Sequence, residues 1–397
     1  MKQHYVARAA LLAISAALVR ADTYLVLPFF NESGNANLNW IGESIADTIH
    51  DAVASQGLMV ISRDDREETY QRLSLKSSAG PLTLASVMRI GQSADADEVF
   101  YGHFNLKAAA DPKKSRGSLS ISAQILDLKH LHEGPAFTET GALEDLATLQ
   151  NHVAWQALEY INPKDAPTEA EFRHRHPPIR VDAIENYMRG LLATTSDDRH
   201  RFLSQALRLE PNFSQAAFQL GRLEWRQKEF RSAAEWLRRV APVDPNYNQA
   251  NFLLGLSRYD LGDFAGAQTA FQIVAANVPL NEVINDLGAA ESRRNLPAAL
   301  DDFQKALEGD ASDPDYHFNV GYALWKRGMF SAAAERFRSV LERDPNDRDA
   351  TLLLERCLKQ AGPRSGDVRT QNLERIKTTY EESAYLELKS ILQKKAP

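Results

Sequence analysis

Apolar runs and helix-spaced apolar residues alternate through the first 161 residues of the chain. The runs TYLVLPFF at 23–30 and LMVIS at 58–62 are rich in β-branched and aromatic residues, which predicts buried strands. Between them an apolar residue recurs every four positions, the spacing of a helix: Ile41, Ile45, Ile49 and Val53. Further helices are predicted at 63–73, 82–92 and 143–161, and further strands at 98–105 and 118–128. This order of elements predicts a small α/β layer domain over residues 22–161.

Residues 181–362 repeat themselves, and this is the strongest pattern in the sequence. Four glycines stand 34, 33 and 33 residues apart: Gly221, Gly255, Gly288 and Gly321. An alanine follows each glycine after eleven or twelve residues, and a large apolar residue comes four positions later. A proline ends each unit: Pro245, Pro279, Pro314 and Pro345. Small residues let two helices approach closely and proline stops a helix, so the pattern predicts helix–turn–helix units.

These units resemble the tetratricopeptide repeat. The resemblance implies an all-α superhelix whose first helices line a concave groove for protein or peptide partners. An irregular unit is expected before the first of these glycines, and a capping helix at 348–360. We expect rigid aromatic and polar side chains of the groove to bind an extended peptide, although such aromatics can instead pack between units. The expected protein-binding residues are Gln215, Phe218, Arg222, Trp225, Arg226, Phe252, Leu256, Tyr259, Asn285, Phe318, Asn319, Tyr322, Trp325 and Lys326.

The N-terminal domain carries a second resemblance. The blocks LPFFNESGNANLNWIGESIADTI, LMVISRDD, ADADEVFYGHF and SISAQILDLKHLHEG resemble, in order and spacing, the TolB-like domain related to the FlgO and CsgG-type envelope proteins of bacteria. The resemblance implies an α/β domain of envelope or regulatory proteins and no catalytic residues. Envelope lipoproteins of that family carry an anchoring cysteine, which this chain lacks near its N-terminus.

The first 21 residues have the order of a secretory signal. Lys2 and Arg8 precede the apolar run AALLAISAALV, and a cleavage site is expected after Ala21. The run is too short for a membrane-spanning helix of ~20 residues. We therefore predict a signal peptide at 1–21, a periplasmic or exported protein, and no stable membrane span after cleavage. If the signal is not cleaved, it would anchor the chain in the inner membrane, facing the periplasm.

Two further segments complete the predicted organisation. Residues 162–180 contain four prolines and many charges, which predicts a linker. Residues 363–397 are predicted to form a C-terminal capping helix and tail, with an apolar stripe at helical spacing from Leu373 to Ile391. This helix is expected to cover the last repeat or lie in the groove, and a homodimer through it is an alternative.

Composition and motifs exclude several classes of function. The 397-residue chain has 44% hydrophobic residues and a net charge of −7, so no global basic field indicates nucleic-acid binding. The single cysteine, Cys357, cannot form an internal disulfide or a CxxC metal site. Phosphate-binding glycine loops and the HExxH and GxSxG motifs are missing from the sequence. We predict no catalytic, cofactor or metal site.

Two functional hypotheses follow from these patterns. The first is a non-catalytic scaffold or adaptor of the bacterial cell envelope that binds partner peptides in the groove. The alternative is a regulatory module whose α/β domain senses a small molecule or nucleotide at its strand ends and whose repeats relay the bound state.

Overall fold

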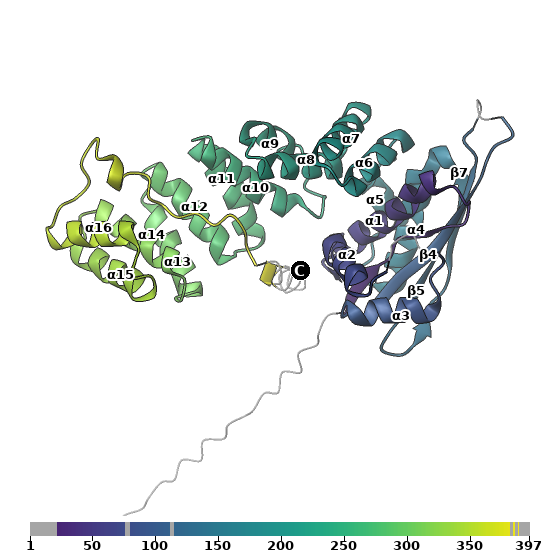
Figure 1. The fold of residues 1–397 in the computed structure, drawn as a ribbon, viewed down its shortest axis with the longest axis horizontal. Coiled ribbons are helices and arrows are strands. Elements are labelled where there is room, and N and C mark those ends of the chain that lie inside the picture. Colours follow the sequence, from purple (N-terminus) through teal and green to yellow (C-terminus); the bar gives the residue numbers. More distant parts are fainter. Residues whose placement is uncertain (1–21, 76–79, 112–114, 382–383, 386–387, 389–397) are drawn as a thin grey trace, which may run out of the picture.

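The computed structural model describes residues 22–75, 80–111, 115–381, 384, 385 and 388. The predicted signal peptide at 1–21 lies outside the described residues. Figure 1 shows an N-terminal domain built on a β-sheet, followed by a curved array of helices. Both parts of the predicted fold class are confirmed: an α/β domain precedes an all-α superhelix of the tetratricopeptide type.

The N-terminal domain is a mixed sheet with helices on both faces. Its described strands are β1 (Thr23–Val26), β2 (Phe30–Asn31), β3 (Met59–Val60), β4 (Glu98–Lys107), β5 (Ser118–Asp127), β6 (His132–Glu133) and β7 (Phe137–Ala142). They pair in the order β3-β1-β4-β5-β6, with β2 beside β4 and β7 beside β5. The pairs β1–β3, β1–β4 and β2–β4 are parallel. The pairs β4–β5, β5–β6 and β5–β7 are antiparallel. Its helices are α1 (Asn39–Ser55), α2 (Arg63–Arg72), α3 (Leu84–Ser93) and α4 (Leu146–Ile161), with 3-10 turns at Ala36–Leu38 and Leu143–Asp145.

The alternation of side chains along β1 divides the domain into two cores. Tyr24 and Val26 face one side, where they pack in a cluster that includes the buried residues of α1 and α4. Leu25 and Leu27 face the other side and pack in a cluster with residues of α2 and α3. Continuous apolar runs such as TYLV are therefore the sequence signature of a strand covered on both faces.

The predicted linker at 162–180 is more structured than its prolines and charges indicate. It contains the short helix α5 (Glu169–Arg175), which begins with a capping box between Thr168 and Glu171. Phe172 of this helix is only 2% exposed and belongs to the core that includes α4. One buried aromatic residue thus ties the connector to the domain, and the interpretation of the whole segment as a linker was wrong at this point.

The repeats are helix pairs whose first and second members alternate along the chain. They are α6 (Val181–Leu192), α7 (Ser196–Leu209), α8 (Ser214–Arg226), α9 (Phe230–Leu237), α10 (Tyr247–Asp260), α11 (Phe264–Asn277), α12 (Asn281–Arg293), α13 (Ala298–Gly309), α14 (Pro314–Lys326), α15 (Phe330–Arg343) and α16 (Arg348–Leu358). The glycines stand where the two helices of a pair touch: a Cβ atom on Gly255 would lie 2.5 Å from the ring of Phe271. Gly190 has the same relation to Leu203, so the irregular unit is a genuine pair, α6 and α7.

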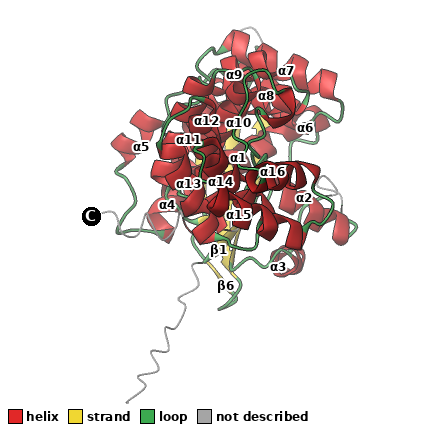
Figure 2. Cartoon of the chain, turned by 90° about the vertical axis from the view of Figure 1, so that its left-hand side faces the viewer, coloured by secondary structure: helices red, strands yellow, loops and turns green. Residues whose placement is uncertain are grey.

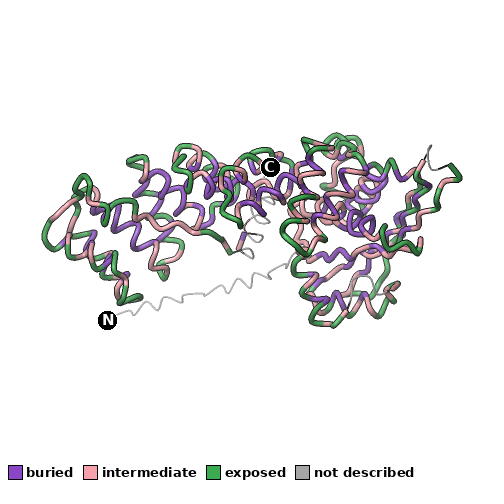
Figure 3. The backbone as a smooth tube through the Cα atoms, turned by 45° about the horizontal axis from the view of Figure 1, so that its top comes forward, coloured by how far each residue is buried: buried purple, intermediate pink, exposed green. Residues whose placement is uncertain are grey.

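The α/β domain and the first repeats share one hydrophobic core. Ile184, Tyr187 and Met188 of α6 lie in the same buried cluster as Ile45 and Ile49 of α1. Polar contacts cross the same junction: Gln215 donates to Asp51 at 3.3 Å, and Arg63 donates to the Leu191 carbonyl at 3.1 Å. Figure 3 shows residues coloured as buried in both regions. Figure 2, seen from the C-terminal end of the array, shows the strands behind the helices of the repeats. No helix in the described part of the chain is long and apolar enough to cross a membrane.

A buried carboxylate pair between α12 and α13 gives the repeats a pH dependence. Burial and the neighbouring Asp302 raise the pKa of Glu291 to about 7. A raised folded-state pKa means that the stability this group contributes is complete below its ordinary pKa and is lost as the pH rises through about 7. Gln268 donates to one oxygen of Glu291 at 3.0 Å, a bond that a glutamine in its place can keep.

We therefore expect Glu291→Gln to stabilise the protein by about 1–3 kcal/mol at pH 8 relative to the parent. At pH 5 the two proteins are expected to have nearly equal free energies of unfolding, because Glu291 is then protonated. Urea titration at both pH values measures the difference. Exposed Glu342→Gln, on α15, is the control and is expected to change neither value; an equal effect of Glu291→Gln at both pH values would contradict the prediction.

Candidate functional site

The first helices of the later repeats line a surface that the C-terminal segment of the chain covers. After α16 the chain turns at 359–366, passes the 3-10 turn Val368–Thr370, and runs back across α14 and α12 toward α10 (Figure 1). We call residues 363–381 the tail. Residues 371–381 form no helix, so the predicted capping helix is wrong over this stretch, whereas Ala384, Tyr385 and Leu388 are helical. The extended backbone leaves its N–H and C=O groups free to bond to the repeats.

Two asparagines of neighbouring repeats hold the tail backbone. Asn319 of α14 accepts from the Arg375 N–H at 2.8 Å and donates to the Arg375 carbonyl at 2.7 Å. Asn285 of α12 stands 34 residues earlier, donates to the same carbonyl at 2.8 Å, and accepts from Asn319 at 2.7 Å. Asp286 accepts from the Lys377 N–H at 2.8 Å. This arrangement recognises an extended main chain through its peptide groups, in the way that a neighbouring strand would.

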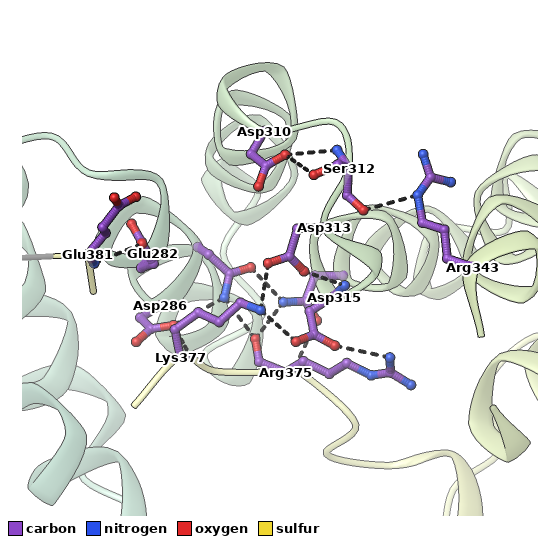
Figure 4. Close-up of polar contacts among 12 residues, drawn as sticks. Glu282, Asp286, Asp310, Ser312, Asp313, Asp315, Arg343, Arg375, Lys377 and Glu381 are labelled. Atoms are coloured by element: carbon purple, nitrogen blue, oxygen red, sulfur yellow. Dashed lines mark hydrogen bonds and ion pairs between the residues drawn. The ribbon is translucent and has the colours of Figure 1, made fainter. Parts of the chain in front are cut away.

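Three aspartates receive the basic side chains of the tail. Arg375 lies 3.2 Å from Asp315 and 2.6 Å from Asp347, and Lys377 lies 2.7 Å from both Asp313 and Asp315. Figure 4 shows Lys377 directed between Asp313 and Asp315.

These ion pairs set the protonation of both partners. Burial alone would raise the pKa of Asp315, but Lys377 and Arg375 hold it below its usual value. Burial alone would lower the pKa of Lys377, but Asp313 and Asp315 raise it. Both partners are therefore charged at neutral pH, and the groove here is an acidic subsite for a cationic ligand.

The preceding tail residue occupies a subsite of opposite charge. The Glu374 side chain is 1% exposed and accepts from the Ser292 hydroxyl at 2.7 Å. Lys326 lies 3.5 Å from it and Arg293 lies 4.0 Å from it. Acidic and basic subsites thus alternate along the groove in step with the charges of the tail, because neighbouring side chains of an extended segment point in opposite directions.

Aromatic residues and apolar tail residues complete the contact. The guanidinium of Arg375 lies 3.7 Å from the ring centre of Phe318, and Tyr380 packs edge-to-face on Phe252 at 5.1 Å between ring centres. Tyr322 donates to the Thr370 carbonyl and Trp325 to the Ala361 carbonyl, both at 2.8 Å. A cavity of about 770 Å³ remains beside the tail, lined in part by Glu282, Tyr316, Lys377 and Tyr380. The tail therefore leaves part of the groove open.

The fourteen sequence-predicted groove residues fall into two sets. One set touches the tail, or, for Trp325, Ala361 in the turn before it: Phe252, Asn285, Phe318, Asn319, Tyr322, Trp325 and Lys326. The other seven have different surroundings. Gln215 bonds to the α/β domain, Arg222 bonds to Gln219, Arg226 is exposed and Trp225 is half-buried. Phe218, Leu256 and Tyr259 are buried in the repeat core, against which the apolar residues of the tail pack.

Polar residues of the site that are absent from these fourteen include Asp286, Ser292, Asp313 and Asp347. The tail sequence could have indicated them. Glu374, Arg375 and Lys377 are charged, and a charged side chain that becomes buried needs a partner of opposite charge. Among the described residues, His, Cys, Asp and Glu side chains form no group of three or more that could hold a metal ion.

Comparisons with known proteins agree with the repeat geometry. The family model described as tetratricopeptide repeat matches residues 199–250, 252–316, 288–348 and 318–358. A search of curated proteins finds no significant match.

Several solved structures are similar to parts of the chain. A double mutant of MamA RS-1 is 23% identical, with a TM-score of 0.36, and the match covers 40% of this chain and 92% of that one. MamA 41-end from Desulfovibrio magneticus RS-1 is 21% identical, with a TM-score of 0.37 and coverage of 42% and 95%. YrrB, described as a TPR protein with an unusual peptide-binding site, is 17% identical, with a TM-score of 0.35 and coverage of 49% and 98%. These TM-scores are low, so the assignment rests on the family model and the helix pairs: residues 199–250 and 252–358 belong to tetratricopeptide repeats.

Proposed function

We propose that this protein is a non-catalytic adaptor of the bacterial cell envelope that binds an extended peptide segment of a partner protein in the groove of α10, α12 and α14. The observation that carries the proposal is the main-chain recognition by Asn285 and Asn319, which together make three hydrogen bonds to the peptide groups of Arg375. Such bonds do not depend on the side chains of the ligand, so another extended segment can take the same place.

The envelope location is supported by two features of the N-terminal sequence. Residues 1–21 have the charged, apolar and cleavage-site regions of a secretory signal. The α/β domain that follows resembles the TolB-like domain of bacterial envelope proteins, and its shared core with α6 would hold the groove at a fixed distance from that domain. The adaptor would thus act in the periplasm.

Export can be tested separately from binding. Residues 1–30 fused to alkaline phosphatase, an enzyme that becomes active only outside the cytoplasm, are expected to give phosphatase activity in bacterial cells. The same fusion with Leu11→Arg and Leu12→Arg, which interrupts the apolar run, is expected to give none. Equal activity from both fusions, or none from the first, would overturn the envelope location.

Partner binding is tested by capture from envelope extract with the full chain as bait. A partner is expected on the parent protein and on the control Asn186→Ala/Asn346→Ala, whose asparagines lie outside the groove. Asn285→Ala/Asn319→Ala is expected to lose that partner while keeping the helical circular dichroism of the parent. A partner that all three proteins retain equally would show that the groove is not the binding surface.

A further inference from the structure

We propose that the tail is a built-in competitor for the groove, and that the segment it competes with carries the same charge pattern, a glutamate or aspartate followed by arginine, an apolar residue and lysine. This inference rests on the proposed function and specifies its partner. The tail supplies this pattern as Glu374, Arg375, Ile376 and Lys377.

The acidic subsite makes a basic ligand necessary. Asp313, Asp315 and Asp347 keep only 20%, 31% and 7% of their side-chain surface exposed when the tail is in place. Asp313 and Asp347 also accept backbone N–H bonds as the N-caps of α14 and α16. Any segment that covers the three aspartates without cations would still leave their charges desolvated and without a counter-ion, which is unfavourable. A segment with an acid at either basic position would add repulsion. The subsite therefore selects arginine and lysine spaced two residues apart.

The basic subsite fixes the residue before the arginine. Ser292, Lys326 and Arg293 surround the Glu374 carboxylate, which is almost completely buried. The hydrogen bonds of Asn319 to the N–H and carbonyl of Arg375 set the register, so the residue that reaches Ser292 is always the one preceding the arginine. Register and charge together distinguish the matching segment from a generic basic peptide.

The tail is suited to leave the groove again. It joins α16 through residues 359–366, where Gly366 has a φ of 84° and Pro363, Arg364 and Ser365 are exposed. Hydrogen bonds and ion pairs hold the tail around Arg375, and its apolar residues are only partly buried where they pack against the repeat core. A tether of this length keeps the tail at an effective concentration on the order of millimolar, so a partner must outcompete it and binds with reduced apparent affinity.

The test uses the full chain and a fluorescein-labelled synthetic peptide of residues 367–381 as the probe. Fluorescence anisotropy is expected to show that the chain with Arg375→Glu/Lys377→Glu binds the peptide at least about tenfold more tightly than the parent chain, because its own tail no longer competes. The charge-matched control Arg364→Glu/Arg369→Glu changes exposed residues of the same segment and is expected to bind as the parent does. A peptide that itself carries Arg375→Glu and Lys377→Glu is expected to bind none of the chains.

Equal binding by the parent and Arg375→Glu/Lys377→Glu chains would overturn the competition, and equal binding of both peptides would overturn the charge pattern. A second measurement needs no variant: excess unlabelled peptide is expected to speed hydrogen exchange at the Arg375 and Lys377 amides of the parent chain. Unchanged exchange at saturating peptide would also overturn the proposal. If these tests fail while groove-dependent capture holds, the partner has another chemistry and the proposed function stands.

Discussion

Replacing Arg66 with methionine is expected to lower the free energy of unfolding by about 3 kcal/mol at pH 7, because it leaves the buried Glu43 with only the more distant Arg63, 3.8 Å away. Arg66 of α2 donates to the Glu43 carboxylate of α1 at 2.7 Å and to the Val26 carbonyl of β1 at 3.1 Å. The two charged side chains are 6% and 10% exposed. Urea unfolding followed by circular dichroism measures the loss.

Two further variants separate the lost charge from lost packing. Glu43→Leu added to Arg66→Met is expected to recover most of the stability, since apolar side chains of similar size can replace a buried ion pair. Arg72→Met, at an exposed position in the last turn of the same helix, is expected to change the stability by less than about 1 kcal/mol. Equal losses from Arg66→Met and the double variant would show that packing, and not the loss of the Arg66–Glu43 ion pair, determines the effect.

The repeats could be predicted from sequence because their spacing reports a contact. Gly255 and Phe271 are sixteen residues apart in the chain and meet where α10 packs on α11, so the pattern of small and large residues encodes the helix pair directly. The buried strands of the sheet could be predicted equally well, because a strand that is buried on both faces needs a continuous apolar run. The first unit was interpreted as irregular because its glycine, Gly190, precedes Gly221 by only 31 residues.

The tail shows what such patterns leave out. Three tail residues, Leu373, Ile376 and Tyr380, and two residues after the tail, Ala384 and Leu388, were expected to be buried, and each packs against the repeat core. Their spacing fits a helix, yet the backbone around Arg375 is extended, because Asn285 and Asn319 bond to its peptide groups in place of the bonds within a helix. Periodicity indicates which side chains are covered. It does not contain the hydrogen-bond partners that residues 90 and 56 positions away supply to the backbone.

The composition of residues 162–180 also did not predict the contact between the α/β domain and the repeats. Prolines and charges at 162–180 indicated two separate units, whereas Phe172 and the apolar face of α6 complete a core shared with α1 and α4. The sequence of α6 has the apolar stripe of an ordinary amphipathic helix. That stripe does not indicate which part of the chain packs against it. Coupling of the repeats to the α/β domain is thus a property of the assembled fold, and it makes the junction a place where a single substitution acts on both regions.

Ile184→Asp is expected to destabilise both regions together, by about 4 kcal/mol or more, because it places an unpaired carboxylate in their shared core. Ile184 is 3% exposed and lies in the cluster that contains Ile45, Ile49 and Val153. The chain has five tryptophans, so the protein is labelled with 5-fluorotryptophan, and the fluorine NMR signal of position 40 reports the α/β domain. Urea unfolding should shift to lower concentration for this signal and for the helical circular dichroism of the protein alike. Leu192→Asp, at the exposed end of the same helix, is the matched control and is expected to change the stability by less than about 1 kcal/mol. A shift confined to the helical signal, with the fluorine transition of position 40 unchanged, would show that the α/β domain folds independently of the repeats.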